Sequence, residues 1–167
     1  MNNSDLKHLA LVKNAIEEFF QFQTHLIEPS EFNSIHTLVC NLPQGPLKLD
    51  RVMNFMFIPF EENGKEEIKM LQFYSILPGA TLKDVDEKLK DLLLHISHRT
   101  MLGNFSINNG SEISFRYVYP VSKANGITPT EFSENVSLFL LTLDMFSVKL
   151  KDYADGSISL DAILRDI

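Results

Sequence analysis

Apolar residues recur with two different periods along this chain, and the order of the periods is the feature that most restricts its fold. Spacings of three and four residues mark one face of a helix, whereas strict alternation marks a half-buried strand. Helical spacing occurs near both ends and in the middle, and strand-like alternation fills the segments between. The sequence therefore predicts an α+β fold in the order α-β-β-β-α-β-β-α, with five strands.

The first half of the chain is expected to contain one helix and three strands. The helix is predicted over 4–23, and the strands over 35–42, 52–60 and 68–77. A polar, Gly-containing turn at 61–65 is expected to join the last two strands as a hairpin. The expected apolar stripe of the helix comprises Leu6, Leu9, Val12, Ile16, Phe19 and Phe20.

A second helix is predicted where Pro78 and Gly79 end the third strand. Thr81 and Asp84 have the spacing of a capping box at its start, and Gly103 suits its end. Its predicted apolar face comprises Leu82, Val85, Leu89, Leu92, Leu93 and Ile96.

A hairpin and a long helix are predicted to follow. Asn and Gly tolerate the positive φ of a tight turn, so residues 108–110 predict a hairpin between two alternating segments. Thr128 is placed as N-cap, Pro129 as the first helical residue and Glu131 as the partner in a capping box. The turn at Asp155 and Gly156 is expected to end this helix before a short terminal one. The residues that alternate at period two in these segments are Phe105, Ile107, Ile113, Phe115, Tyr117 and Tyr119.

Two elements are apolar on both faces, and these are the candidate functional features. In strand 52–60, one face carries Met53, Phe55 and Phe57, and the other carries Val52, Met56 and Ile58. In the long helix, one stripe is Phe132, Val136, Phe139, Leu143, Phe146 and Leu150, and the other is Leu138, Leu141, Met145 and Val148. Either helices of the same chain cover both faces, or one face meets a partner. The candidate partner-binding residues are Met53, Phe55, Phe57, Leu138, Leu141 and Met145.

Titratable side chains do not predict a metal centre. Glu87, Asp91, His95 and His98 share one helical stripe and have the chemistry of zinc ligands. That stripe lies opposite the apolar face of its helix, so a solvated polar surface is the preferred interpretation. Asp152 and Asp155 lack the ligand spacing of a calcium loop.

The remaining candidates for chemistry have plainer structural interpretations. Cys40 and His36 would lie about 13 Å apart along a strand, too far for proton transfer, so Cys40 is expected in the core. Arg116 lies among aromatic residues and is expected to make a cross-strand or cation–π contact. The phosphate-binding and nucleophile-elbow motifs are absent. The sequence therefore predicts no cofactor, no metal and no enzymatic activity.

Charge and composition restrict the partners. A net charge of −7 argues against phosphate backbones and anionic membrane surfaces, which attract Lys and Arg. A single Cys excludes an internal disulfide. With no signal-like amino terminus and no apolar run of about 20 residues, a cytoplasmic protein is expected.

The order of elements carries a resemblance to a known fold. Together with ISFRYVYP at 113–120 and TPTEF at 128–132, it resembles the type III secretion chaperone-like fold, which includes the YbjN-type bacterial proteins. The resemblance implies a twisted antiparallel sheet with helices packed mainly on one face. It also implies a small acidic protein, usually a homodimer, that binds a polypeptide and has no catalytic residues.

The expected function is that of a binding module. We interpret residues 1–167 as one domain that is non-enzymatic, chaperone-like or regulatory, and that binds protein or peptide as a homodimer. Binding to nucleic acid or membrane is not expected. The alternative is a regulatory domain that senses a small molecule in a pocket, and an enzyme of unrecognised type ranks third.

Overall fold

The structure is a computed structural model that describes residues 3–31, 33–59, 67–81, 87–108 and 112–166. In these ranges it contains four helices and one six-stranded antiparallel sheet, so the α+β class is confirmed. The elements are α1 (Asn3–Phe20), β1 (Thr24–Ile27), β2 (Thr37–Leu42), β3 (Arg51–Ile58), β4 (Ile68–Thr81), α2 (Glu87–Ser97), β5 (Asn104–Asn108), β6 (Glu112–Ser122), α3 (Pro129–Ala154) and α4 (Leu160–Asp166).

The sheet has one strand more than the five predicted. Its order is β1-β2-β3-β4-β6-β5, and the unpredicted strand is β1 at one edge. The expected first helix ends early because Gln21 adopts a positive φ of 57°, which lies outside the helical region. The chain then turns back, and β1 pairs with β2 from Thr24 opposite Cys40 to Ile27 opposite Thr37. The four residues of β1, THLI, do not alternate between polar and apolar side chains, so the hydrophobic pattern gives no strand signal there.

β4 passes through the point where the sequence predicted a break. It continues beyond Pro78 and Gly79 to Thr81, and its register with β6 shifts between Ile76 and Thr81. Gly79 has a φ of 72°, so the two residues predicted to end the strand instead produce an irregularity within it. Thr81 therefore belongs to a strand, and the described part of α2 begins at Glu87.

Some predictions fall on residues that the structure does not describe. These are the turn at 61–65, positions 82–85 of the second helix with Asp84 among them, and the hairpin turn at 109–110. The strands on either side of the last turn do pair as predicted, from Phe105 opposite Phe115 to Asn108 opposite Glu112.

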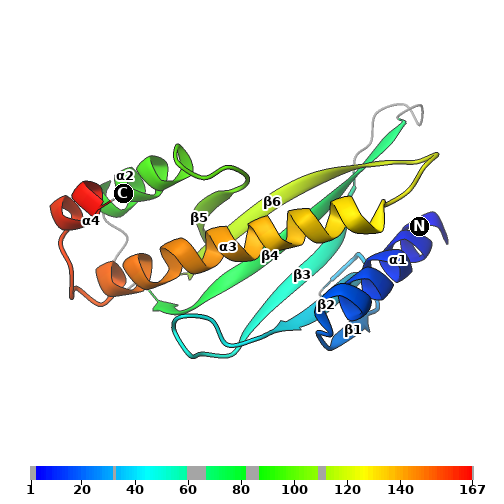
Figure 1. The fold of residues 1–167 in the computed structure, drawn as a ribbon, viewed down its shortest axis with the longest axis horizontal. Coiled ribbons are helices and arrows are strands. Elements are labelled where there is room, and N and C mark those ends of the chain that lie inside the picture. Colours follow the sequence, from blue (N-terminus) through cyan, green and yellow to red (C-terminus); the bar gives the residue numbers. More distant parts are fainter. Residues whose placement is uncertain (1–2, 32, 60–66, 82–86, 109–111, 167) are drawn as a thin grey trace.

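The described helices pack on one face of the sheet (Figure 1). α3 crosses the sheet along its length, α1 lies beside it near β1 to β3, and α2 and α4 lie at the end near β5. Ring contacts fix the side on which α1 and α3 pack. His8 of α1 lies 5.8 Å from Phe57 of β3, and Phe132 of α3 lies 5.7 Å from Phe55 on the same strand. One hydrophobic core therefore lies between the sheet and its helices.

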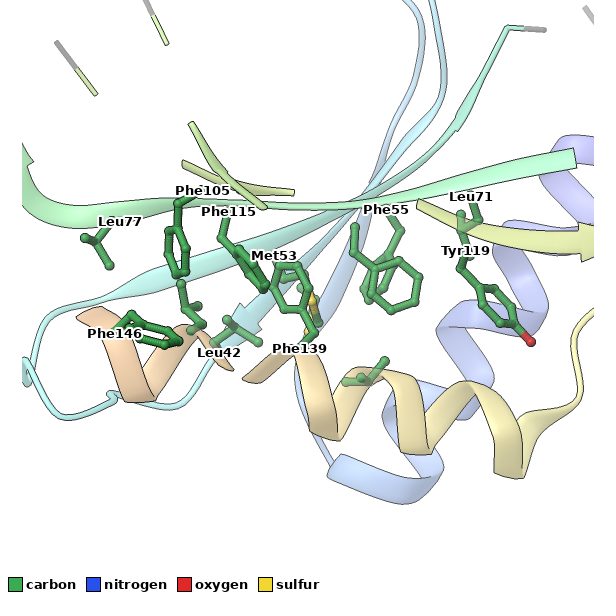
Figure 2. Packing of buried hydrophobic residues seen from close by; sticks show 14 of the residues in the cluster. Leu42, Met53, Phe55, Leu71, Leu77, Phe105, Phe115, Tyr119, Phe139 and Phe146 are labelled. Carbon is green, nitrogen blue, oxygen red and sulfur yellow. The ribbon is translucent and has the colours of Figure 1, made fainter. Parts of the chain in front are cut away.

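Aromatic residues dominate the middle of this core. Phe55, Phe105 and Phe115 reach from the sheet toward α3, and Phe139 and Phe146 reach back from the helix (Figure 2). Phe105 stacks on Phe115 with ring centroids 4.5 Å apart, and Phe115 lies 4.7 Å from Phe139. The core contains many Phe and Leu side chains and no Trp, since the chain has 13 Phe and lacks Trp.

The start of α3 matches the prediction in position but not in its hydrogen bonds. Thr128 has the extended backbone of an N-cap, with φ −82° and ψ 115°, and Pro129 opens the helix. The Thr128 side chain makes no capping hydrogen bond, so the predicted capping box does not form. Glu131 instead accepts a hydrogen bond from Tyr119, and burial together with this carboxylate raises the pKa of Tyr119 to about 12.

Cys40 provides a test of how tightly the core excludes water. Its side chain is fully buried, and burial raises the pKa of the thiol from 9.0 to about 12. Because the pKa of the thiol is higher in the folded than in the unfolded protein, the buried neutral thiol makes its full contribution to the free energy of unfolding below pH 9. That contribution is lost as the pH rises toward 12. Above pH 9, wild type should lose about 1 kcal/mol more unfolding free energy per pH unit than Cys40→Ala. Urea unfolding at pH 8 to 11 measures this difference.

Tyr119 also titrates in this range, but it is present in both proteins, so the comparison isolates Cys40. Parallel pH curves for the two proteins would show that the thiol is hydrated in the folded state.

Candidate interaction surface

The predicted strand half of the partner-binding set lies in the core. Met53 and Phe55 are completely buried and Phe57 is 7% exposed. These side chains face the helices, as the orientation of Met53 and Phe55 in Figure 2 shows. The interpretation as core therefore holds for this face, and the partner-binding assignment of these three residues is corrected. Their strand is apolar because α1 and α3 both pack on it.

The helix half of the predicted set lies on the surface. Leu141 and Met145 are 52% and 54% exposed, Val148 is 37% exposed and Leu138 is half-buried. Spacings of three, four and three residues align them on the outer side of α3, over about 15 Å of helix. The opposite stripe, from Phe132 to Leu150, is buried as predicted. We call Leu138, Leu141, Met145 and Val148 the outer stripe.

A shallow groove continues the outer stripe toward α1. It lies between the two helices and is lined by Phe19, Phe20, Ser133, Glu134, Ser137 and Leu138. Phe20 is half-buried and stacks on Phe22, with ring centroids 5.3 Å apart. Phe19 is 47% exposed, although the sequence pattern placed it in the buried stripe of the first helix. It lies in the last turn of α1, beside the groove.

A polar network occupies the face of the sheet that the described helices leave open. Arg116 Nε donates to Gln72 Oε1 across β4 and β6. Asn108 Nδ2 donates to the hydroxyl oxygens of Tyr74 and Ser114, the latter at 2.8 Å. The predicted cross-strand role of Arg116 is thus confirmed. The other members were missed, although polar residues alternate on this side of the predicted strands.

The titratable candidates do not assemble into a site. His95 and His98 are exposed, and α2 ends at Ser97, so His98 lies beyond the helical stripe. Asp155 forms an ion pair with Lys151. In the described ranges, His, Cys, Asp and Glu form no group of three or more that could hold a metal ion.

The Cys40 thiol is equally unsuited to chemistry. It points into the core, and its raised pKa keeps it protonated at neutral pH, whereas nucleophilic attack requires the thiolate. His36 precedes β2, and its Nδ1 is buried without a hydrogen-bond partner among the described residues. The predicted structural role of Cys40 is confirmed.

Comparison with known families and with characterised proteins finds no relative for this chain: no family profile and no curated sequence matches it. None of the helices in the described part of the chain is both long and apolar enough to cross a membrane.

Proposed function

We propose that this protein is a non-enzymatic polypeptide-binding module of chaperone-like architecture that acts as a homodimer. The observation that carries the proposal is the outer stripe, an apolar row left exposed on the longest helix of the described chain. Exposed apolar rows of this kind mark interaction sites, because leaving them in water is unfavourable.

A second copy of the chain is the occupant that suits the outer stripe. When two copies of α3 pack antiparallel about a twofold axis, Leu141 of one copy faces Met145 of the other. In the same arrangement Leu138 faces Val148, so every apolar position meets another apolar one. A twofold interface requires a surface that is complementary to itself in this way.

Charge does not oppose this pairing at the centre of the outer stripe. Asp144 is the one charged residue between Leu141 and Met145 in the sequence. Its carboxylate binds the guanidinium of Arg51, whose side chain is only 6% exposed. The centre of the stripe therefore presents apolar groups beside a neutralised acid, as the core of a homodimer interface requires.

Architecture supports the chaperone-like part of the proposal. The order of the major elements and the single helix-covered face agree with the resemblance to the type III secretion chaperone-like fold. One face of the sheet and the groove beside Phe19 then remain for a polypeptide partner.

Light scattering on size-exclusion fractions tests the dimer. Wild type should have a mass of about twice the chain mass, since C2 homodimers dominate among oligomers. Leu141→Glu combined with Met145→Glu should dissociate the dimer and raise its Kd at least about 100-fold, because charges would be buried against each other. Both side chains are exposed in the monomer, so the variant should keep its circular dichroism spectrum.

Leu94→Glu is the matched control. Leu94 is a 59% exposed leucine on α2, away from the outer stripe, so its replacement should leave the mass unchanged. A wild-type monomer at high micromolar concentration, or equal masses for all three proteins, would contradict the dimer.

A further inference from the structure

The open face of the sheet has a donor-rich centre between two apolar flanks. Tyr74 on β4 and Arg116 on β6 are direct register partners, and Gln72 lies two residues before Tyr74, on the same face of β4. Met70 and Val118 lie on one side of this centre, and Val52 and Ile76 on the other. From Met70 to Ile76 the row spans about 20 Å along β4. We call this row the donor strip.

Hydrogen bonds within the donor strip orient the donor side chains and leave some of their N–H and O–H groups available to a ligand. Gln72 accepts from Arg116 Nε, which fixes the guanidinium and leaves its terminal N–H groups available. Tyr74 accepts from Asn108, so its own O–H is available to donate. Ser114 accepts a second hydrogen bond from Asn108, and the hydroxyl of Ser106 lies 3.1 Å from that of Ser114.

The guanidinium of Arg116 has no carboxylate partner among the described residues, which sets it apart from the other described cations that are not fully exposed. Acidic residues outnumber basic ones by 22 to 15. Arg51, Lys69 and Lys149 each bind a carboxylate. The nearest acidic residue on the same face of β6 is Glu112, four positions away and so about 13 Å along the strand. The half-buried cation therefore lies at the centre of the face with no counter-ion among the described side chains.

We propose that the donor strip binds a polypeptide segment that carries an Asp or Glu side chain between apolar residues. The carboxylate accepts hydrogen bonds from Arg116 and Tyr74, which supply donors in the fork-like arrangement that carboxylates prefer. The apolar neighbours of that residue pack on Met70 and Val118 at one end and on Val52 and Ile76 at the other. The inference rests on the polypeptide-binding part of the proposed function but not on the outer stripe.

The length of the donor strip favours a polypeptide over a small carboxylate. A small acid would contact only the central donors, on an open surface that buries little of it. An extended segment of about six residues matches the 20 Å row and places alternate side chains on the sheet. The apolar flanks then contribute to binding along with the charge.

The probes are two acetylated peptide amides, LVDVLK and LVNVLK, which differ only in the central carboxylate. Titrated into ¹⁵N-labelled full-length protein, LVDVLK should shift the Arg116 Nε–H cross-peak and the backbone amides of Gln72 and Tyr74. LVNVLK, which lacks the carboxylate, should bind wild type about tenfold or more weakly than LVDVLK does. Arg116→Gln should weaken the binding of LVDVLK by a similar factor, the loss expected for charge-assisted hydrogen bonds. Tyr74→Phe should weaken it by about threefold, since one neutral donor is lost.

Arg99→Gln is the charge-matched control, since this exposed arginine follows α2 and lies outside the donor strip. The affinity of the Arg99→Gln variant for LVDVLK should equal that of wild type. Equal affinities for the two peptides, or equal effects of Arg116→Gln and Arg99→Gln, would overturn the carboxylate site. If Arg116→Gln perturbs the fold, Tyr74→Phe still decides, because it keeps the ring and removes only the hydroxyl.

The outcomes separate this site from the wider function. Shifts confined to Leu141, Met145 and Phe19 would locate polypeptide binding elsewhere and overturn only the donor strip. Absence of any saturable shift with either peptide at millimolar concentration would count against polypeptide binding altogether, whereas the dimer is judged separately by light scattering.

Discussion

Replacing Phe73 with alanine is expected to lower the free energy of unfolding by about 3 to 5 kcal/mol, the range for Phe-to-Ala changes in cores. Phe73 is completely buried on β4, and its ring contacts five other aromatic rings. Its partners come from β3, β6 and α3. They are Phe55 at 4.9 Å, Tyr117 at 5.3 Å, Phe132 at 5.5 Å, Phe139 at 5.9 Å and Tyr119 at 6.2 Å.

The cost is high because these neighbours cannot all collapse into the cavity. They are fixed on separate strands and on a helix, so relaxation at one wall leaves the others in place. Phe73→Leu keeps most of the volume and should cost only about 1 to 1.5 kcal/mol. Guanidinium unfolding followed by circular dichroism measures both variants. A loss below about 1 kcal/mol for Phe73→Ala would mean that α3 does not pack on β4 as described.

Replacing Asp144 with alanine is expected to cost about 2 to 4 kcal/mol, toward the lower end for a broken buried ion pair because Asp144 is partly exposed. The substitution leaves the guanidinium of Arg51 without its counter-ion, and only 6% of that side chain is exposed. Arg51 Nε also donates to Pro43 O at 2.8 Å, so the arginine joins the loop before β3 to α3. A Cβ added to Gly45 would lie 2.5 Å from the guanidinium, so the loop leaves the unpaired cation little room to move.

The two partners of this ion pair should respond differently to removal. Arg51→Met leaves Asp144, which water can reach, so it should cost about 1 to 2 kcal/mol. The double variant Arg51→Met/Asp144→Ala should be no less stable than Arg51→Met alone, because no buried charge remains. Urea unfolding of all four proteins gives the coupling energy. Additive losses would show that the two groups do not form a pair in solution.

The long helix illustrates how much of the fold the sequence can reveal. Its two stripes follow from spacing alone, and the structure buries one and exposes the other. Spacing could not tell which apolar face of strand 52–60 was covered, because that depends on where α1 and α3 pack. The sequence pattern therefore allows a partner-binding role for Met53, Phe55 and Phe57, although these residues lie in the core.

Long-range contacts account for the features that sequence patterns missed. β1 exists because Gln21 turns the chain back onto β2, and a positive φ at Gln leaves no mark in hydrophobic periodicity. The donor strip brings together Gln72, Tyr74, Asn108 and Arg116 from three strands. Arg116 could be recognised from its aromatic neighbours in sequence, but its partners depend on the register between β4, β6 and β5.

The contact between the two outer stripes tests the central claim most directly. Protein mixed from ¹³C-labelled and unlabelled chains reports only contacts between copies in an isotope-filtered NOE experiment. The proposed dimer predicts intermolecular cross-peaks between the methyl groups of Leu141 and Met145, and between those of Leu138 and Val148. A dimer that lacks these cross-peaks, or a chain that stays monomeric at the millimolar concentration of the experiment, would contradict the proposal that the outer stripe of α3 meets a second copy.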